Sequence, residues 1–296
     1  MDIGIYTYVP TVDGLVAEVR SAADQGFTSF WMPQIFGLDT LSAYAAVARE
    51  VPDIDLGTAA VPIHRAHPMA LAQQALTVSQ LNGGRLALGI GLSHQVVVES
   101  MWGLSYDKPL RYMREYLQAL LPMLSGEASS VDGQAVTSHG SLDVDAPAPQ
   151  VLVAALGPKM LELAGRVADG TVTWLVGPNT LASHIVPSIN RSAEAADRPA
   201  PQIAAGLPVC VTDNPEKARE RAAEMLIMYG GLPSYRAMLD REGASGPEDI
   251  AVIGSAAEVA DRLAGVSESG VTTIAASEFG NPDELAATRD VLVSLL

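Results

Sequence analysis

The sequence predicts an α/β protein, a (β/α)₈ TIM barrel with insertions after strands 4 and 7. Four stretches read as a helix end, a glycine and an apolar strand: 22–32, 80–91, 166–176 and 266–276. Each has a glycine that fits the position just past a helix, where a left-handed backbone is needed: Gly26, Gly84, Gly170 and Gly270. Further apolar strands are predicted at 2–6, 54–61, 150–155 and 203–211. Eight such strands separated by helices predict the barrel.

The strands do not alternate cleanly between polar and apolar residues, which indicates parallel strands covered on both faces. The intervening helices are predicted to be amphipathic. The apolar positions that show this are Leu71, Ala75 and Val78 in one helix and Met160, Leu163, Ala164 and Val167 in another. A doubly wound open sheet is the competing fold, although it usually needs fewer strands.

Two connections are too long for a minimal βα unit. Residues 92–149 contain a predicted helix near 108–124 and a polar, glycine-rich stretch, and residues 212–268 contain several predicted helices. Loops that follow barrel strands line the active-site face, so both insertions are predicted to form a lid or a pocket wall. The sequence contains no convincing linker, and we expect one domain over 1–296.

The charge of the chain indicates which kinds of molecule it can bind. The chain has 34 acidic and 18 basic residues and a formal net charge of −16, which argues against nucleic acid and anionic membranes as partners and leaves a small molecule. Its single cysteine, Cys210, excludes an internal disulfide and suits a reducing cytoplasm. The N-terminal residues do not resemble a signal peptide, and no apolar run approaches the length of a membrane span.

The stretch "GIGLSH" at 89–94 admits several interpretations. A dinucleotide loop is disfavoured because His94 stands where the third glycine of that motif belongs. A serine hydrolase is disfavoured because Ser93 and His94 are neighbours whose side chains point apart, and no G-x-S-x-G elbow is present. The simplest alternative is a polar surface loop that follows a strand ending in glycines.

Two further motifs suggest ligands. His64 and His67 lie three residues apart, but Pro68 disfavours a helix at His67 and no other metal-ligand motif is present, so we expect no metal site. In "VAALGPK", a predicted strand ends at Leu156 and Gly157, and Pro158 opens a helix. Free amides at that helix end, with Lys159, would suit a phosphate; a tight turn without a ligand is the alternative.

Together these stretches resemble the luciferase-like monooxygenase superfamily, and more narrowly its coenzyme F420-dependent (deazaflavin) oxidoreductases. The segments that carry the resemblance cover well over half of the chain: 26–39, 56–95, 104–117, 151–178 and 232–243. Most specific is the combination of "GGRLALGIG" with "ALGP" and "AGRVADG". Since flavin and deazaflavin branches share the barrel, the resemblance is less specific for the cofactor.

The resemblance implies a cofactor site with assigned residues. A bulge in the third strand, with a non-prolyl cis peptide at Ala59–Ala60 followed by Val61, would touch the central ring of the cofactor. Gly91 to His94 would lie beside the ring and the ribityl tail, with Ser93 as a hydrogen-bond donor. The cofactor phosphate would lie at the amides of Leu156 and Gly157, next to Pro158 and Lys159. A homodimer is also implied.

The chain departs from many relatives at the end of the second strand, where Gln34 replaces an acidic residue or a histidine. Glutamine cannot shuttle a proton at neutral pH, so His94 becomes the best acid or base and Asp39 the second. Four side chains are expected to form apolar pocket walls, with simple core packing as the alternative: Tyr6, Trp31, Met101 and Trp174.

We therefore expect a cytoplasmic oxidoreductase that transfers a hydride between C5 of coenzyme F420 and a small organic substrate. One alternative is a monooxygenase that uses flavin mononucleotide (FMN) on the same barrel. Another is a flavin- or deazaflavin-binding protein without turnover, an interpretation that Gln34 favours.

Overall fold

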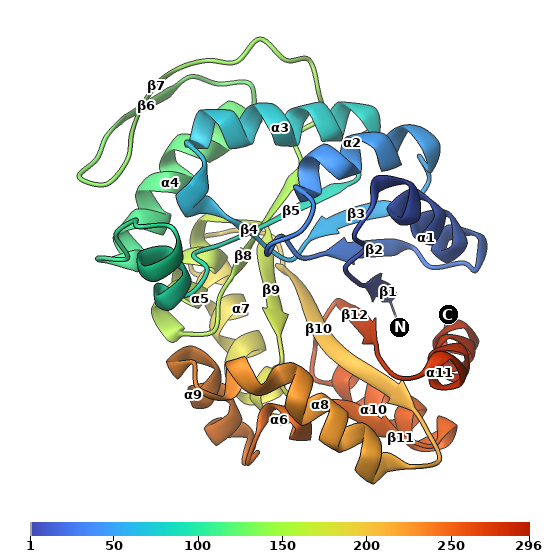
Figure 1. Cartoon of the computed structure of the whole chain (residues 1–296). Coiled ribbons are helices and arrows are strands. Elements are labelled where there is room, and N and C mark those ends of the chain that lie inside the picture. Colours follow the sequence, from blue (N-terminus) through green and yellow to red (C-terminus); the bar gives the residue numbers. More distant parts are fainter. Residues whose placement is uncertain (1) are drawn as a thin grey trace. The chain divides into compact units, whose positions relative to one another are not determined.

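A computed structural model describes residues 2–296 and confirms the predicted barrel; Met1, the first residue of the expected domain, lies outside the described residues. Eight parallel strands close into a barrel in chain order (Figure 1). They are β1 (Ile3–Tyr6), β2 (Ser29–Met32), β3 (Asp55–Thr58), β5 (Leu86–Gly91), β8 (Gln150–Ala154), β9 (Gly170–Trp174), β10 (Gln202–Val211) and β12 (Thr273–Glu278). All eight strands predicted from the sequence are present.

The residues form two compact units. The first holds the chain up to Thr7, Ala22–Trp31 and Ala155–Leu296; the second holds Tyr8–Ser21 and Met32–Ala154. Helix α1 (Val12–Asp24) contributes to both. Whether the chain folds as one domain stays a prediction.

The first unit contains paired parallel strands and most of the helices. Strand β10 pairs with β9, β12 and the short β11 (Val252–Gly254), and β1 pairs with β12 and β2. The helices are α5 (Pro158–Val167), α6 (Pro178–Thr180), α7 (Val186–Glu194), α8 (Pro215–Gly230), α9 (Pro233–Glu242), α10 (Ala256–Glu268) and α11 (Pro282–Ser294). Capping boxes at Ser255 and Asn281 start α10 and α11 by satisfying first-turn N–H groups.

Three of the four predicted helix-ending glycines have a positive φ: Gly26, Gly84 and Gly270. The expectation for Gly170 was wrong, because this residue is the first of strand β9. A Cβ placed on Gly170 would lie 1.9 Å from the backbone oxygen of Gln202 on the neighbouring strand. Glycine is required there for the close approach of two strands rather than for a left-handed turn.

The second unit is organised around strand β5, which pairs with β3, β4 (Val61–Pro62) and β8. Its helices are α2 (Thr40–Glu50), α3 (Pro68–Leu81) and α4 (Pro109–Leu124), with a 3₁₀ turn η1 at Ile63–Arg65 and a π-helical turn η2 at Val97–Met101. The predicted apolar positions of α3 are buried. In α5 of the first unit, the buried residues are Leu161, Ala164 and Gly165. Of the predicted apolar positions only Ala164 is among them, so the buried face is rotated slightly about the helix axis.

The long connections contain more structure than the sequence predicts. The segment between β5 and β8 holds η2, the predicted helix as α4, and an antiparallel hairpin of β6 (Ser129–Asp132) and β7 (Thr137–Gly140). The segment between β10 and β12 holds α8, α9, a 3₁₀ turn η4 (Pro247–Asp249), β11 and α10. A second π-helical turn, η3 (Leu181–Ile185), precedes α7.

A one-residue bulge separates β3 from β4, as the resemblance implied. Gly57 pairs with Ala87 and Val61 with Ile90, so the β3–β4 side has one residue more than β5 between these pairs. At the bulge, the buried hydroxyl of Thr58 donates to the carbonyl oxygen of Gly89 at 2.7 Å. This side chain provides the interstrand hydrogen bond where the regular ladder is interrupted.

We expect Thr58→Val to destabilise the protein by about 1–2 kcal/mol, because it leaves the buried Gly89 carbonyl without its donor while keeping the side-chain volume. Urea unfolding measures the change. Thr58→Ser, which keeps the hydroxyl, is the matched control; equal losses in both variants would show that the hydrogen bond contributes nothing.

Candidate active site

The carboxyl end of β5 meets small residues of two neighbouring segments. A Cβ on Gly91 would lie 3.2 Å from the Cβ of Ala154 and 3.6 Å from that of Ala60, so the three backbones approach closely. The Ala59–Ala60 peptide is cis, which confirms the expectation from the resemblance. Val61 is buried, whereas Ala59 and Ala60 are partly exposed.

Residues 92–94 form a lip beyond β5. Ser93 adopts a left-handed conformation (φ 59°), and its carbonyl oxygen accepts from the hydroxyl of Tyr106 at 3.4 Å. The carbonyl of His94 accepts from the N–H groups of Val97 and Val98, both at 2.9 Å, and so anchors the following helical turn. The His94 imidazole is half-buried, and this burial lowers its pKa from the ordinary value.

Gln34 and Asp39 lie together in the same unit. The side-chain N–H of Gln34 donates to Oδ2 of Asp39 at 3.1 Å, and Oε1 of Gln34 accepts from the N–H of Thr40 at 3.2 Å. Oδ1 of Asp39 accepts from the N–H of Ser42 at 2.9 Å and caps helix α2. Both carboxylate oxygens of Asp39 are therefore engaged in holding the start of α2.

The two histidines of the "HRAHP" stretch have different roles. Nδ1 of His67 accepts from the N–H of Met69 at 3.2 Å, and Nε2 bonds to the carbonyl oxygen of Thr137 at 2.9 Å, so His67 caps α3 and fastens the hairpin. His64 stacks on Tyr112 with ring centroids 4.5 Å apart and on Tyr106 at 5.6 Å. Burial lowers the pKa of His64, opposed by a hydrogen bond with the Leu92 backbone.

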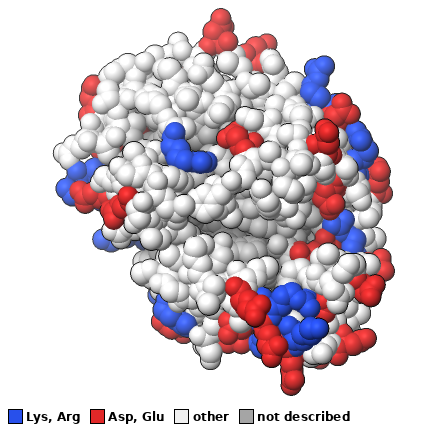
Figure 2. All heavy atoms as spheres, viewed as in Figure 1, with Lys and Arg blue, Asp and Glu red and all other residues white. Residues whose placement is uncertain are grey.

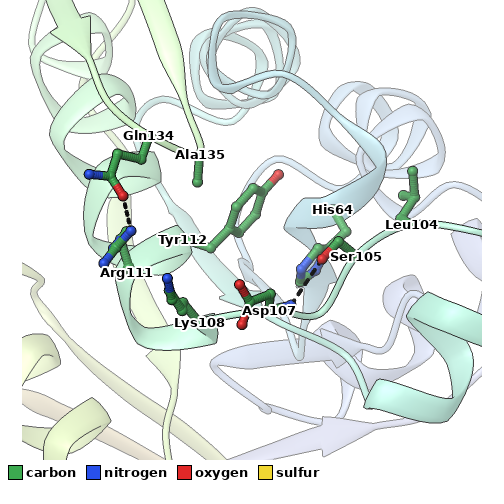
Figure 3. A pocket seen from close by; sticks show the side chains of 9 residues that line it. All are labelled: His64, Leu104, Ser105, Asp107, Lys108, Arg111, Tyr112, Gln134 and Ala135. Carbon is green, nitrogen blue, oxygen red and sulfur yellow. Dashed lines mark hydrogen bonds between the residues drawn. The ribbon is translucent and has the colours of Figure 1, made fainter.

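A pocket of about 450 Å³ adjoins this stack in the second unit. Figure 3 shows its lining residues, which come from η1, from the segment that leads into α4, from the first turn of α4 and from the turn of the β6–β7 hairpin. Thus the insertion after β5 forms a pocket wall. The sequence interpretation considered His64 only as a metal ligand and missed its partners Tyr106 and Tyr112, which no local pattern connects with it.

In the first unit, the β8–α5 junction has an open helix N-terminus. Gly157 occupies the N-cap with no side-chain cap, Pro158 opens the helix, and a Cβ on Gly157 would meet nothing within 4 Å. The carbonyl of Leu156 is bonded to Nε2 of His184 at 2.9 Å. Gly157, Pro158 and Lys159 are exposed. Pro158 has no N–H and that of Met160 donates to the Gly157 carbonyl at 3.1 Å, so the N–H groups of Gly157 and Lys159 are the ones that an anion could reach.

An aromatic cluster of the first unit contains two predicted wall residues. Tyr6 and Trp174, the last residues of β1 and β9, stack with centroids 4.8 Å apart. Tyr229 of α8 packs edge-on against Trp174 at 6.4 Å and against Tyr235 of α9 at 4.9 Å. Sequence reasoning missed these two tyrosines, because nothing in the helix pattern indicates which helices turn toward the strand ends.

The other two predicted wall residues lie elsewhere. Trp31 is 1% exposed, and its Nε1 donates to Oγ of Ser29 at 3.0 Å, so it belongs to the core, the alternative weighed for it. Met101 of η2, in the second unit, is 60% exposed.

Surface charge, metal-ligating groups and helix length do not indicate a further ligand in the described residues. Figure 2 shows acidic side chains spread around the visible face among basic ones. Over residues 2–296, no three metal-ligating side chains gather into a metal-binding group. The helices of this described part are all too short or too polar to cross a bilayer.

The fold and the site define an α/β protein of the (β/α)₈ barrel class with a bulge and a cis peptide after its third strand. A family model described as luciferase-like monooxygenase matches residues 2–273, and the chain belongs to this family. It is 27% identical to 5,10-methylenetetrahydromethanopterin reductase of Methanolobus tindarius over 283 residues, which are 93% of this chain and 85% of that relative.

Solved structures share the fold over nearly the full chain. Coenzyme F420-dependent tetrahydromethanopterin reductase from Methanopyrus kandleri superposes with a TM-score of 0.82 at 20% identity, covering 100% of this chain and 98% of that one. An F420-dependent secondary alcohol dehydrogenase, in complex with an F420–acetone adduct, also gives 0.82 at 18% identity, covering 100% and 99%. The oxygenating constituent of 3,6-diketocamphane monooxygenase from Pseudomonas putida, in complex with FMN, gives 0.77 at 18% identity, covering 99% and 96%.

We expect the imidazoles of His64 and His94 to titrate below about 6.5, the ordinary pKa of histidine, because burial disfavours the charged ring. As the pH falls below this value, the unfolded chain binds protons before the folded one, so both rings reduce stability in acid. Histidine-selective NMR titration measures the two pKa values, with His64→Gln and His94→Gln to assign the signals. A pKa at or above 6.5 for either ring would contradict the burial.

Proposed function

We propose that the protein is a coenzyme F420-dependent oxidoreductase that transfers a hydride between the deazaflavin C5 and a small organic substrate. The observation that carries the proposal is the uncapped start of α5 at Gly157, an open anion site in a chain of the luciferase-like family. The F420-dependent enzymes that share its fold support the choice of cofactor.

The residues present fit such a cofactor at two places. The partly exposed backbone at Ala59 and Ala60 would contact the flat ring, with Val61 and Gly91 behind it and Ser93 donating a hydrogen bond. The first-turn amides of α5, with the Lys159 charge, would hold the phosphate. When bound, the deazaflavin supplies the hydride chemistry, and the protein supplies position and shielding.

The proton that accompanies hydride transfer is assigned to His94. It is the titratable group on the lip beyond β5, and a positioned imidazole transfers protons near neutral pH. Gln34 and Asp39 are hydrogen-bonded to each other, and together they would position the start of α2 or the substrate. Tyr6 and Trp174 would form an apolar wall for the substrate, and we expect a homodimer.

An FMN-dependent monooxygenase is the second candidate function, favoured by the fold shared with the FMN complex of the diketocamphane enzyme. Binding titrations of the purified protein with coenzyme F420 and with FMN, side by side, distinguish the two. Preferential binding of F420 supports the proposal, and preferential binding of FMN overturns it. Binding of either cofactor without turnover on any substrate would favour the non-catalytic alternative.

We expect Gly157→Val to weaken F420 binding by at least about tenfold, or roughly 1.4 kcal/mol, because its side chain would enter the space in front of the α5 amides. The structure has room for the side chain, so the variant should fold normally. Gly157→Ala should give a smaller loss in the same titration. Wild-type affinity in a folded valine variant would mean that the phosphate is held elsewhere.

We expect His94→Ala to keep F420 affinity within a few-fold and to lower the rate of substrate reduction at least about a hundredfold, since the positioned acid is lost. In the wild type, the rate should fall as the pH rises through a pKa below about 6.5, because only the protonated ring donates and burial lowers its pKa. Stopped-flow bleaching of reduced F420 measures both effects. His139→Ala, on the exposed hairpin, is the control; an unchanged rate in His94→Ala would assign the proton to water or another group.

A further inference from the structure

The pocket beside His64 lies entirely in the second unit and uses none of the residues assigned to the cofactor (Figure 3). Its volume of about 450 Å³ is in the range of small-molecule sites. Its walls combine two cations, a stacked histidine and side-chain amide and hydroxyl groups, which is a polar lining for a pocket of this size.

The cations favour a negatively charged occupant. Lys108 is the N-cap of α4, and no acidic side chain forms an ion pair with it anywhere in residues 2–296. Arg111, in the first turn of the same helix, is bonded to the amide oxygen of Gln134. Asp107 also lines the pocket, and the carboxylate of Glu115 acts on Arg111, so the charge of Lys108 is the one left for an anion.

The turn that carries Gln134 is itself fastened to α4. Oε2 of Glu115 accepts from the N–H groups of Ala135 and Val136 at 2.7 and 3.0 Å. A Cβ on Gly133 would lie 2.3 Å from the same oxygen, so glycine is needed for this contact. The hydrogen bonds of Glu115 to the hairpin turn thus hold Arg111 of α4 and Gln134 of the turn together at the pocket.

His64 indicates a second requirement of the occupant. Its Nδ1 is buried and has no hydrogen-bond partner among the described residues, while the ring also bonds to the Leu92 backbone. Burial favours the neutral ring, in which one nitrogen donates and the other accepts. With the donor used on the Leu92 carbonyl, Nδ1 is an unused acceptor, which an O–H or N–H group of a ligand would satisfy.

We propose that this pocket is a second binding site, for a small organic anion whose carboxylate or phosphate is held by Lys108 and Arg111 and whose O–H or N–H group donates to Nδ1 of His64. Asp107 accepts a further donor of the same ligand. Two contacts, His64 with Leu92 and Tyr106 with Ser93, connect the surroundings of the pocket with the lip that carries His94.

The test uses three probes on the full-length protein: acetate, glycolate and inorganic phosphate, followed by the NMR signals of the histidine rings. All three should shift the His64 signal in a saturable way, and glycolate should bind more tightly than acetate because only glycolate carries an O–H donor. His64→Phe keeps a ring in the stack and should abolish the preference for glycolate; binding in this variant is followed by backbone amide signals of the pocket.

Lys108→Ala should weaken binding of every probe at least about fivefold, because a charge-assisted hydrogen bond is lost. Arg114→Ala removes the same charge from an exposed position of α4 and is the matched control. Equal losses in both variants, or the absence of any saturable shift, overturn the proposal. Gly157→Val separates the two sites: phosphate binding lost in this variant but kept in Lys108→Ala would place the probe at α5 and also overturn it.

Discussion

The pairing of strand β5 with three strands of its unit is the constraint on which the second unit's site depends. Its hydrogen bonds to β3, β4 and β8 fix where each neighbour ends. Because the β3–β4 side carries one extra residue, the pairing with β5 is interrupted at Ala59 and Ala60, and the Thr58 hydroxyl donates to the Gly89 carbonyl there. Gly91 then allows the backbones to converge. The lip that holds Ser93 and His94 starts from this fixed point.

The barrel strands could be predicted because each one is marked by a pattern within its own short stretch of sequence. A predicted helix-ending glycine followed by an apolar run marks four of the strands and an apolar run alone marks the other four, and eight strands suffice for the fold class. The hairpin of β6 and β7 was not readable in this way. Its strands, SSVD and TSHG, are polar and partly exposed, and contacts with α4 through Glu115 hold them in place. Strand β11 has three residues and exists through its pairing with β10.

The site residues could be predicted from the sequence only in part. The cis peptide and the open start of α5 were found because a family resemblance and a Gly-Pro helix start mark them locally. Asp39 was interpreted as an acid or base, yet the sequence Asp-Thr-Leu-Ser is also an N-cap pattern, and the structure uses it as one. The stack of His64 on Tyr106 and Tyr112 brings together residues more than forty positions apart. No local pattern encodes such a contact.

The hydrogen bonds around Gln34 bear on the proton transfer that we propose for the lip. Both oxygens of Asp39 accept hydrogen bonds, and the amide of Gln34 is used at both ends, so neither side chain exchanges a proton without releasing the start of α2. In His94, the backbone carbonyl anchors η2 by accepting from the N–H groups of Val97 and Val98. Burial keeps the ring neutral at neutral pH, in the form that accepts a proton. In the proposed reaction, such a ring would suit the removal of a proton from a substrate that loses a hydride better than the supply of a proton in the reverse direction.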